Sequence, residues 1–82
     1  MDRSKLLEQV VDVIADTLSV KKEAINEDTN LVDDIQVDSL DMVDLVLAIE
    51  QEFGIEIKDE DITPDIKTIK DVVELLEKYL KI

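Results

Sequence analysis

Apolar residues recur three and four positions apart near the start of the chain, with acidic residues between them. The pattern runs from Leu6 to Leu18. This spacing places the apolar side chains on one face of a helix of roughly four turns. Asp2 and Ser4 are both suitable N-cap residues, so the sequence predicts that this helix begins at one of the two.

Helical spacing fades between Ser19 and Asp38, where polar residues dominate. A loop of this length in a small domain is unusual and tends to be functional. Four scattered apolar residues are expected to hold it against the core: Ile25, Leu31, Val32 and Ile35.

A second helix is predicted from Asp38 to Phe53, where Gly54 ends it. Asp38 is a suitable N-cap, and Asp41 three residues later completes a pattern like a capping box. The start and the end of this helix are therefore both marked in the sequence.

The remaining chain predicts one short helix and one longer one. "KDEDITPD", residues 58–65, indicates a single helical turn that Asp59 caps and that ends before Pro64. Thr68 and Asp71 repeat the cap pattern ahead of apolar residues at helical spacing: Ile69, Val72, Val73, Leu76, Tyr79 and Leu80. Strand signals are scarce. The sequence therefore predicts an all-α fold, a small four-helix bundle with a short third helix and a long loop between helices one and two, in a single domain over residues 1–82.

The predicted second helix has apolar side chains on two sides when its residues are placed at about 100° each. One group is expected to face the core: Met42, Leu45, Val46, Ile49 and Phe53. The other group, which we call the second stripe, lies on the same side as Glu50 and consists of Leu40, Val43 and Leu47. Two interpretations remain open. Either the short third helix or the long loop covers the second stripe, or the stripe is an exposed apolar patch rimmed by acids, as at protein interaction sites.

Composition narrows the possible functions. The 82 residues include 22 acids and 9 bases, for a net charge of −13, and contain no Cys and no His. Disulfides, thiolate metal sites and the commonest general base are thereby excluded. Hydrophobic residues make up 45% of the chain and fall at helical spacing, which excludes the signature of disorder.

The charge also restricts the partners. No Lys or Arg lies between Glu23 and Ile57. Nucleic acids and anionic membranes would be repelled, so the expected partners are basic protein surfaces, with free cations as a weaker possibility. The N-terminus has no apolar run of signal-peptide or membrane-span length, so a cytoplasmic location without membrane insertion is expected.

Ser39 stands between Asp38 and Asp41 at the first turn of the second helix. A serine hydroxyl becomes a nucleophile only with a base, and hydrolases use His or, less often, Lys. The chain has no His, and Lys58 belongs well after the helix. We therefore expect no enzymatic activity. A phosphate ester on Ser39 would instead lie near unpaired N–H groups and the positive end of the helix dipole, which favour an anion.

Residues 33–62, "DDIQVDSLDMVDLVLAIEQEFGIEIKDEDI", resemble the signature of the acyl carrier proteins. The shared features are Asp-Ser-Leu at the head of the second helix, an apolar helix with acids that ends in Glu-Phe-Gly, then Ile-x-Ile and an acidic third helix. The first helix, "TNLVDDI" in the loop and a closing helix after "IKTI" follow in the family's order. The tripeptide alone is a weak signal, whereas in these surroundings it is highly specific.

The resemblance implies a carrier that is a substrate of enzymes and catalyses nothing itself. Ser39 would receive phosphopantetheine from coenzyme A through a separate phosphopantetheinyl transferase, and the thiol of this arm would hold acyl groups as thioesters. The implied partners are acyl transferases and fatty-acid-synthesis enzymes with basic docking patches, and the carrier is expected to be a monomer.

The same resemblance assigns two further sets of residues. The docking surface for partner enzymes would consist of Asp38, Leu40, Asp41, Val43, Asp44, Leu47, Glu50 and Ile57. Acyl chains are sheltered inside the helical bundle in this family. Four residues are expected either to line such a chain pocket or to be plain core: Val46, Ile49, Phe53 and Ile66.

Four positions depart from the family's pattern. Gln36 and Ser19 stand where Gly is usual, Gln51 replaces a usual acid, and the stretch around Pro64 is one residue longer. Because Gln adopts glycine-like backbone angles only at a cost, the loop that leads to Ser39 is expected to bend differently. The departures favour a specialised carrier over a housekeeping one.

Fatty-acid synthesis is the favoured pathway, because the three aspartates at 38, 41 and 44 are closest to that branch. The runner-up is a carrier for a polyketide, aminoacyl or other dedicated pathway. A different class is an acidic interaction or cation-binding module that is never modified. "DEDITPD" lacks the central Gly and closing Glu of a calcium loop, so no specific metal site is predicted.

Overall fold

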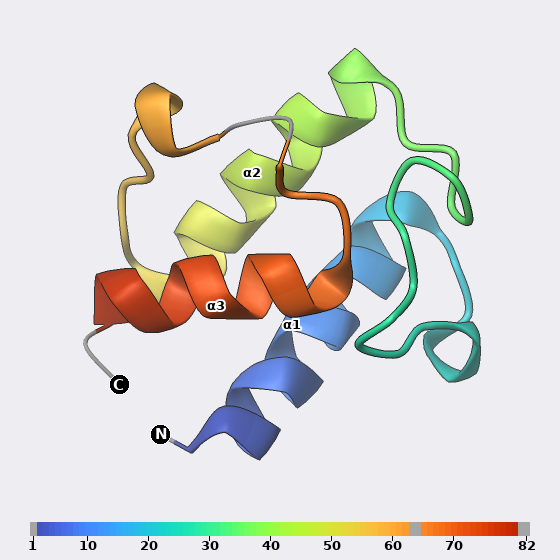
Figure 1. Cartoon of the computed structure of the whole chain (residues 1–82), viewed down its shortest axis with the longest axis horizontal. Helices are drawn as coiled ribbons and strands as arrows, with labels where there is room; N and C mark the ends of the chain where they lie inside the picture. The colour runs from blue at the N-terminus through green and yellow to red at the C-terminus, as the bar shows by residue number, and fades with distance from the viewer. Residues whose placement is uncertain (1, 63–64, 81–82) are drawn as a thin grey trace.

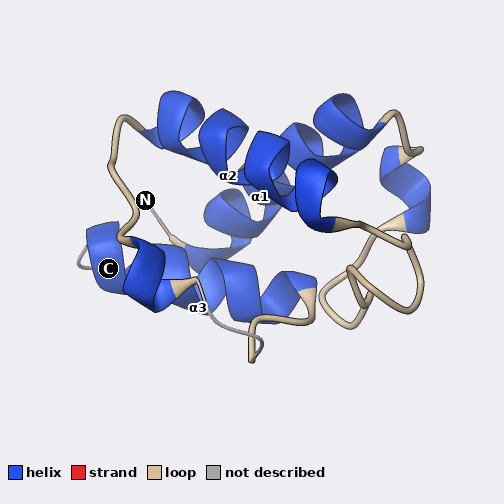
Figure 2. Ribbon diagram, turned by 90° about the horizontal axis from the view of Figure 1, so that it is seen from above, coloured by secondary structure: helices blue, strands red, loops and turns tan. Residues whose placement is uncertain are grey.

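The computed structural model describes residues 2–62 and 65–80, and within them every regular element is helical (Figure 1). Three α-helices and two short 3-10 turns follow in the order α1 (Arg3–Leu18), η1 (Lys22–Ala24), α2 (Ser39–Phe53), η2 (Asp59–Asp61) and α3 (Ile69–Leu80). No strand occurs in this part of the chain, and the only ladder contact there is an isolated bridge between Asn30 and Thr68 (Figure 2). The all-α prediction is confirmed.

The predicted count of four helices is wrong. The short third helix is a 3-10 turn of three residues, η2, so the described residues contain three α-helices. The sequence gives the reason, because Pro64 follows closely and disfavours a helical conformation in the residue before it. Pro64 itself lies outside the described residues, and so does the predicted capping by the Asp59 side chain.

The predicted helix ends agree with the structure. Asp2 caps α1 by accepting the N–H of Lys5 at 2.9 Å, which decides between the two candidate caps. At the head of α2, Asp38 accepts the N–H of Asp41 at 2.8 Å and Asp41 accepts that of Asp38 at 3.4 Å. Both halves of the predicted capping box are therefore formed.

The start of α3 is capped in the same reciprocal way. Asp71 accepts the N–H of Thr68 at 3.0 Å, and the Thr68 hydroxyl accepts the N–H of Asp71 at 3.2 Å. The Asp71 carboxylate also accepts the N–H of Lys67 at 3.0 Å. The N–H groups of Thr68 and Lys67 hold the pKa of this carboxyl below its ordinary value, because they stabilise its charged form.

Helix α1 is the centre of the packing. It lies against both α2 and α3, whereas α2 and α3 make few or no direct contacts with each other. The side chains that are almost fully buried come from all three helices and from the long loop: Leu6, Val10, Ile14, Leu31, Leu45, Ile69, Val73 and Leu76. The space between α2 and α3 is consequently not filled by helix–helix packing.

The long loop, residues 19–38, is held firmly despite its length, and we call it the pinned loop. Its backbone bonds to the residue before the α3 cap and to the first residues of α3: Leu31 N–H to Lys67 O at 2.7 Å, Ile69 N–H to Thr29 O at 3.1 Å and Lys70 N–H to Glu27 O at 3.0 Å. Figure 1 shows this loop (cyan to green) beside the start of α3.

The apolar anchors of the pinned loop are as predicted with one exception. Ile25 and Leu31 are buried and Ile35 is half-buried against the core. Val32 is 54% exposed, so its predicted role as an anchor is wrong. The side-chain oxygen of Asn30 accepts the N–H groups of Val32 and Asp33, each at 2.9 Å, and this turn leaves Leu31 buried while Val32 faces outward.

Three of the described residues have a left-handed backbone, namely Ser19 (φ 56°), Gln36 (φ 63°) and Gly54 (φ 64°). Ser19 and Gly54 end α1 and α2. The expectation that Gln36 would change the bend of the loop before Ser39 is wrong in this respect, since Gln36 itself adopts the left-handed angle that suits Gly. A non-glycine residue in this conformation is strained by about 1–2 kcal/mol.

Candidate functional site

Ser39 is the first residue of α2 and is exposed. The capping box beneath it fixes where the helix begins, because Asp38 takes the N–H of Asp41. Its hydroxyl therefore projects at a helix N-terminus, where the dipole and the free N–H groups of the first turn favour a bound anion.

The second stripe begins next to Ser39 and is open to solvent. Leu40 is 76% exposed, Val43 56% and Leu47 51%. The interpretation that the short third helix or the long loop covers this stripe is therefore wrong. The exposed stripe continues into a shallow groove whose lining includes Glu50, Ile57 and Ile62.

The acids predicted around this stripe differ in what they do. Asp38 and Asp44 are exposed, and Asp41 is half-buried within the capping box. Glu50 is half-buried, and one of its carboxylate oxygens accepts the N–H of Ile57 at 2.7 Å. Glu50 thus holds the following segment against α2 as well as contributing negative charge beside the stripe.

Ile57, which was predicted for the docking surface, has a side chain that is only 7% exposed. It lies at the boundary between the groove on the second stripe and the cavity behind it. Direct contact between Ile57 and a partner would therefore be limited to the base of the groove.

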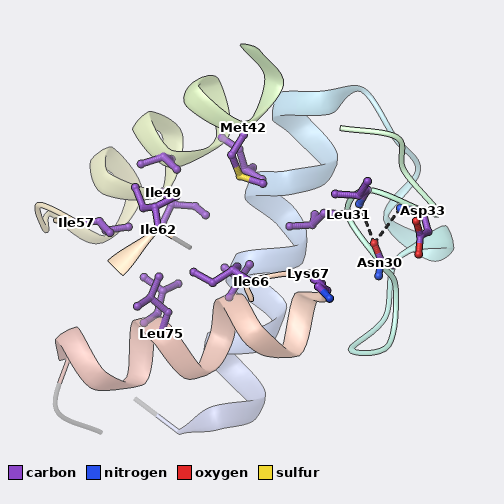
Figure 3. Close-up of a pocket in the computed structure, with 15 residues that line it drawn as sticks. Asn30, Leu31, Asp33, Met42, Ile49, Ile57, Ile62, Ile66, Lys67 and Leu75 are labelled. Carbon is purple, nitrogen blue, oxygen red and sulfur yellow. Dashed lines mark hydrogen bonds between the residues drawn. The ribbon is translucent and has the colours of Figure 1, made fainter. Parts of the chain in front are cut away.

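A largely apolar cavity of about 410 Å³ separates α2 from α3 (Figure 3). Its volume lies in the range of small-ligand sites, about 300–1,000 Å³. Met42, Ile49, Ile62, Ile66 and Leu75 face one another across it, from α2, the connection to α3, and α3 itself. Polar groups occur at one end, where Asn30, Asp33 and Lys67 border the space.

Three of the four residues predicted for a chain pocket line this cavity: Val46, Ile49 and Ile66. For Phe53 the other stated alternative holds, since it is half-buried against the core and outside the cavity lining. The chain turns at Gly54 just after it, and Ile57 and Ile62 line that end of the cavity instead.

Several lining residues were missed by sequence reasoning, above all Ile62 and Leu75. Leu75 stands three residues after Val72 on the apolar side of α3, so its spacing was a usable signal. Ile62 is a single apolar residue in an acidic stretch, and no periodicity marks it.

Other kinds of site lack support in the described part of the chain. No group of three or more acidic, histidine or cysteine side chains among residues 2–62 and 65–80 is arranged to hold a metal ion. None of the helices formed by these residues is long and apolar enough to span a bilayer.

Comparison with known proteins agrees with this site. Residues 8–76 match the family model described as "Phosphopantetheine attachment site". Acyl carrier proteins of Coprothermobacter proteolyticus and Syntrophobacter fumaroxidans are 44% and 46% identical, and these matches cover 98% and 95% of this chain and 96% and 95% of the relatives. The acyl carrier protein of Petrotoga mobilis is 43% identical, over 100% of this chain and 95% of its own.

A solved structure has the same fold. The solution structure of a holo acyl carrier protein from Nitrosomonas europaea matches with a TM-score of 0.82, over 93% of this chain and 96% of that one. At 22% identity, this likeness concerns the fold alone.

The family model and the relatives define a carrier that bears phosphopantetheine. The chain belongs to the acyl carrier protein family. It is accordingly a non-catalytic carrier of acyl groups with phosphopantetheine as its prosthetic group, and membership of this family implies interaction with transferases and fatty-acid-synthesis enzymes.

The residues around Ser39 fit this group. The hydroxyl is exposed, as attachment by another enzyme requires, and the head of α2 offers N–H groups and a positive dipole end to the phosphodiester. Asp38 and Asp41 add negative charge nearby, but one carboxylate oxygen of each is engaged by a backbone N–H in the capping box.

Proposed function

We propose that Ser39 is the residue that carries the phosphopantetheine arm. The observation that supports this most directly is its position, exposed in the first turn of α2 at the head of the second stripe. The two other serines, Ser4 and Ser19, lie in the first turn and at the C-terminal cap of α1, away from that stripe.

In this proposal the residues of the protein position the arm and shelter the acyl chain, and they perform no bond-making step. The arm supplies a thiol on which acyl groups are held as thioesters. The capping box of Asp38 and Asp41 fixes the head of α2, so the arm leaves the protein at a defined point. The cavity between α2 and α3 excludes water from an apolar chain, and each buried methylene favours sheltering by about 0.8 kcal/mol.

We also propose that the second stripe is the docking surface for partner enzymes, together with Asp38, Asp41, Asp44, Glu50 and the edge of Ile57. Its exposed apolar side chains would supply contact area next to Ser39. The acids would steer partners with basic patches, because complementary charge raises association rate and selectivity. The proposed partners are a phosphopantetheinyl transferase, acyl transferases and enzymes of fatty-acid synthesis.

The proposed pathway is fatty-acid biosynthesis, and the alternative is a carrier dedicated to a polyketide, aminoacyl or other pathway. Ser19 and Gln36 keep the left-handed backbone that their glycine counterparts would allow, so these departures no longer favour the alternative. The proposal includes a single acyl-carrier domain over residues 1–82, a monomer with its docking surface free, and a cytoplasmic location.

The attachment is tested by intact mass. The protein is incubated with coenzyme A, Mg²⁺ and a broad-specificity phosphopantetheinyl transferase, and wild type should gain one phosphopantetheine. Ser39→Ala should gain none. Ser4→Ala is the matched control, since Ser4 is also an exposed serine in the first turn of a helix capped by an aspartate, and it should be modified like wild type. Modification of Ser39→Ala, or none of wild type, would contradict the proposal.

The docking surface is tested by charge reversal. Asp44→Lys should lower kcat/KM of a fatty-acid-synthesis enzyme about two- to fivefold at low salt, the size expected for an exposed ion pair. Asp16→Lys is the control, because it makes the same change in net charge at an exposed position on α1. Equal effects of the two variants would mean that only net charge matters and would count against a localised surface.

A further inference from the structure

Residues 55–62, which we call the strap, connect α2 to the region before α3 and form one wall of the cavity. Ile57 and Ile62 of the strap line the cavity together with Ile49 of α2 and Leu75 of α3 (Figure 3). Figure 2 shows the strap passing from the C-terminal end of α2 across to the C-terminal end of α3. It closes the space that helix packing leaves open.

Two successive backbone N–H groups of the strap bond to opposite helices. The N–H of Ile57 donates to the carboxylate of Glu50 on α2 at 2.7 Å. The N–H of Lys58 donates to the hydroxyl oxygen of Tyr79 on α3 at 3.0 Å. The strap is therefore fastened on both sides of the cavity by side chains.

The hydroxyl of Tyr79 makes a second contact, since it donates to the carboxylate of Asp61 in η2. This hydrogen bond raises the pKa of Tyr79 above its ordinary value, because it stabilises the protonated phenol. Lys78 lies 3.8 Å from the other carboxylate oxygen of Asp61 but is largely exposed, so its contribution is small. One phenol thus holds the strap at two points, Lys58 and Asp61.

The strap has little structure of its own to resist opening. The N–H of Ile55 donates to the carbonyl of Glu50 at 3.1 Å, which belongs to the end of α2, and the N–H of Asp61 donates to the carbonyl of Lys58 at 3.0 Å, within the strap itself. Release of the Tyr79 contacts would therefore free the wall on the α3 side while the three helices stay intact.

We propose that Tyr79 is a positioning residue whose hydroxyl latches the strap to α3 and so sets how readily the cavity opens to admit or release an acyl chain. This inference rests on the proposed sheltering of acyl chains in the cavity. Tyr79 touches neither the arm nor Ser39 in this account. It acts through the positions of Lys58 and Asp61, and hence of Ile57 and Ile62.

The hydrogen bonds between the Tyr79 hydroxyl and the strap are tested first in the protein without an acyl chain. Tyr79→Phe removes only the hydroxyl, and in the arm-free protein the Lys58 amide should exchange its hydrogen about three- to tenfold faster, as the loss of one hydrogen bond implies. The amide of Ile69, which bonds to the pinned loop, should be unchanged. Arg3→Met is the control, because it removes the 3.0 Å ion pair with Glu77 that joins α1 to α3 outside the strap.

Unchanged exchange at Lys58 in Tyr79→Phe would overturn the proposal. It would also be overturned if exchange at Lys58 and Ile69 rose together, as global destabilisation would cause. The effect on a bound acyl chain is measured on the octanoyl-loaded protein as the rate at which hydroxylamine cleaves the thioester. This rate should be several-fold higher for Tyr79→Phe than for wild type.

The two proposals fail in different ways. If the wild-type thioester reacted as fast as free octanoyl-pantetheine, the sheltering in the cavity would be contradicted, whatever Tyr79 does. If the wild-type thioester were protected and Tyr79→Phe protected it equally well, sheltering would stand and the latch would be overturned.

Discussion

The two connections between the helices are built in opposite ways. The pinned loop, residues 19–38, is long, yet it buries Ile25, Leu31 and Val37 and bonds to the start of α3 through its backbone. The strap is much shorter, but its links to α2 and α3 run through the side chains of Glu50 and Tyr79. Length alone therefore says little about how firmly a connection is held.

The two connections lie on different sides of the molecule, and these two sides also differ in how they are packed. On the side of the pinned loop, backbone hydrogen bonds to Lys67, Ile69 and Lys70 hold the loop in place, and its residues border only the polar end of the cavity. On the side of the strap, α2 and α3 stand apart and a cavity lies between them. A carrier that must hold a chain and later give it up needs one rigid side and one side that can adapt.

The largest effect on this comparison is expected from truncating an anchor of the pinned loop. Ile25→Ala should lower the free energy of unfolding by about 2–4 kcal/mol, as for other buried Ile-to-Ala changes. Ile62→Ala in the strap should cost less than half as much, because Ile62 is only half-buried. Urea denaturation with unchanged m-values measures both. Equal losses would mean that the two connections do not differ as described.

A second effect concerns the turn into the strap. Gly54→Ala should destabilise the protein by about 1 kcal/mol, because Gly54 has a left-handed φ of 64°. Apart from Gly54 itself and its chain neighbours, no atom lies within 4 Å of the position that the new Cβ would take, so the loss comes from the backbone conformation and not from a clash. A neutral result in urea denaturation would show that the helix end relaxes without strain.

The reverse substitutions in the pinned loop should stabilise. Gln36→Gly and Ser19→Gly each relieve a left-handed non-glycine residue, and the gain should be about 0.5–1 kcal/mol after the larger chain entropy of Gly is subtracted. Gln36→Ala keeps a Cβ and is the control, with no gain expected. Stabilisation by Gln36→Ala equal to that by Gln36→Gly would point to the side chain instead of the backbone.

The smallest effect is a pH dependence at the start of α3, next to its contact with the pinned loop. Asp71 has a folded-state pKa below its ordinary value of 3.8, because the N–H groups of Thr68 and Lys67 bond to its carboxylate. This stability is fully present above the unfolded-state pKa and is lost as the pH falls through the folded-state pKa. The stability difference between wild type and Asp71→Asn should therefore narrow below about pH 4. A difference independent of pH would contradict this role of the charge.

The sequence predicted the features that depend on local chemistry. The capping boxes at Asp38–Asp41 and Thr68–Asp71 and the stop at Gly54 are short-range patterns, and the structure contains all three. The second stripe also followed from helical period, which left open whether it is covered or exposed, and the structure shows that it is exposed.

The sequence did not predict features that depend on contacts between segments far apart in the chain. Helical spacing placed Tyr79 on an apolar side of α3, but the partners of its hydroxyl lie about twenty residues away in the strap. The cavity lies between α2 and α3, which make few or no direct contacts with each other, and no helical periodicity predicts this. Val32 was misplaced because a turn at Asn30, formed by side-chain bonds, reverses the direction of one residue.

The central claim is that a chain held on Ser39 is sheltered between α2 and α3. The most direct measurement is a nuclear Overhauser experiment on the octanoyl-loaded protein with a labelled acyl chain. The end of a sheltered chain should show contacts to the methyl groups of Ile62, Ile66 and Leu75, and none to Ile25 in the pinned loop. Contacts confined to the residues around Ser39, with the chain otherwise in solvent, would contradict it.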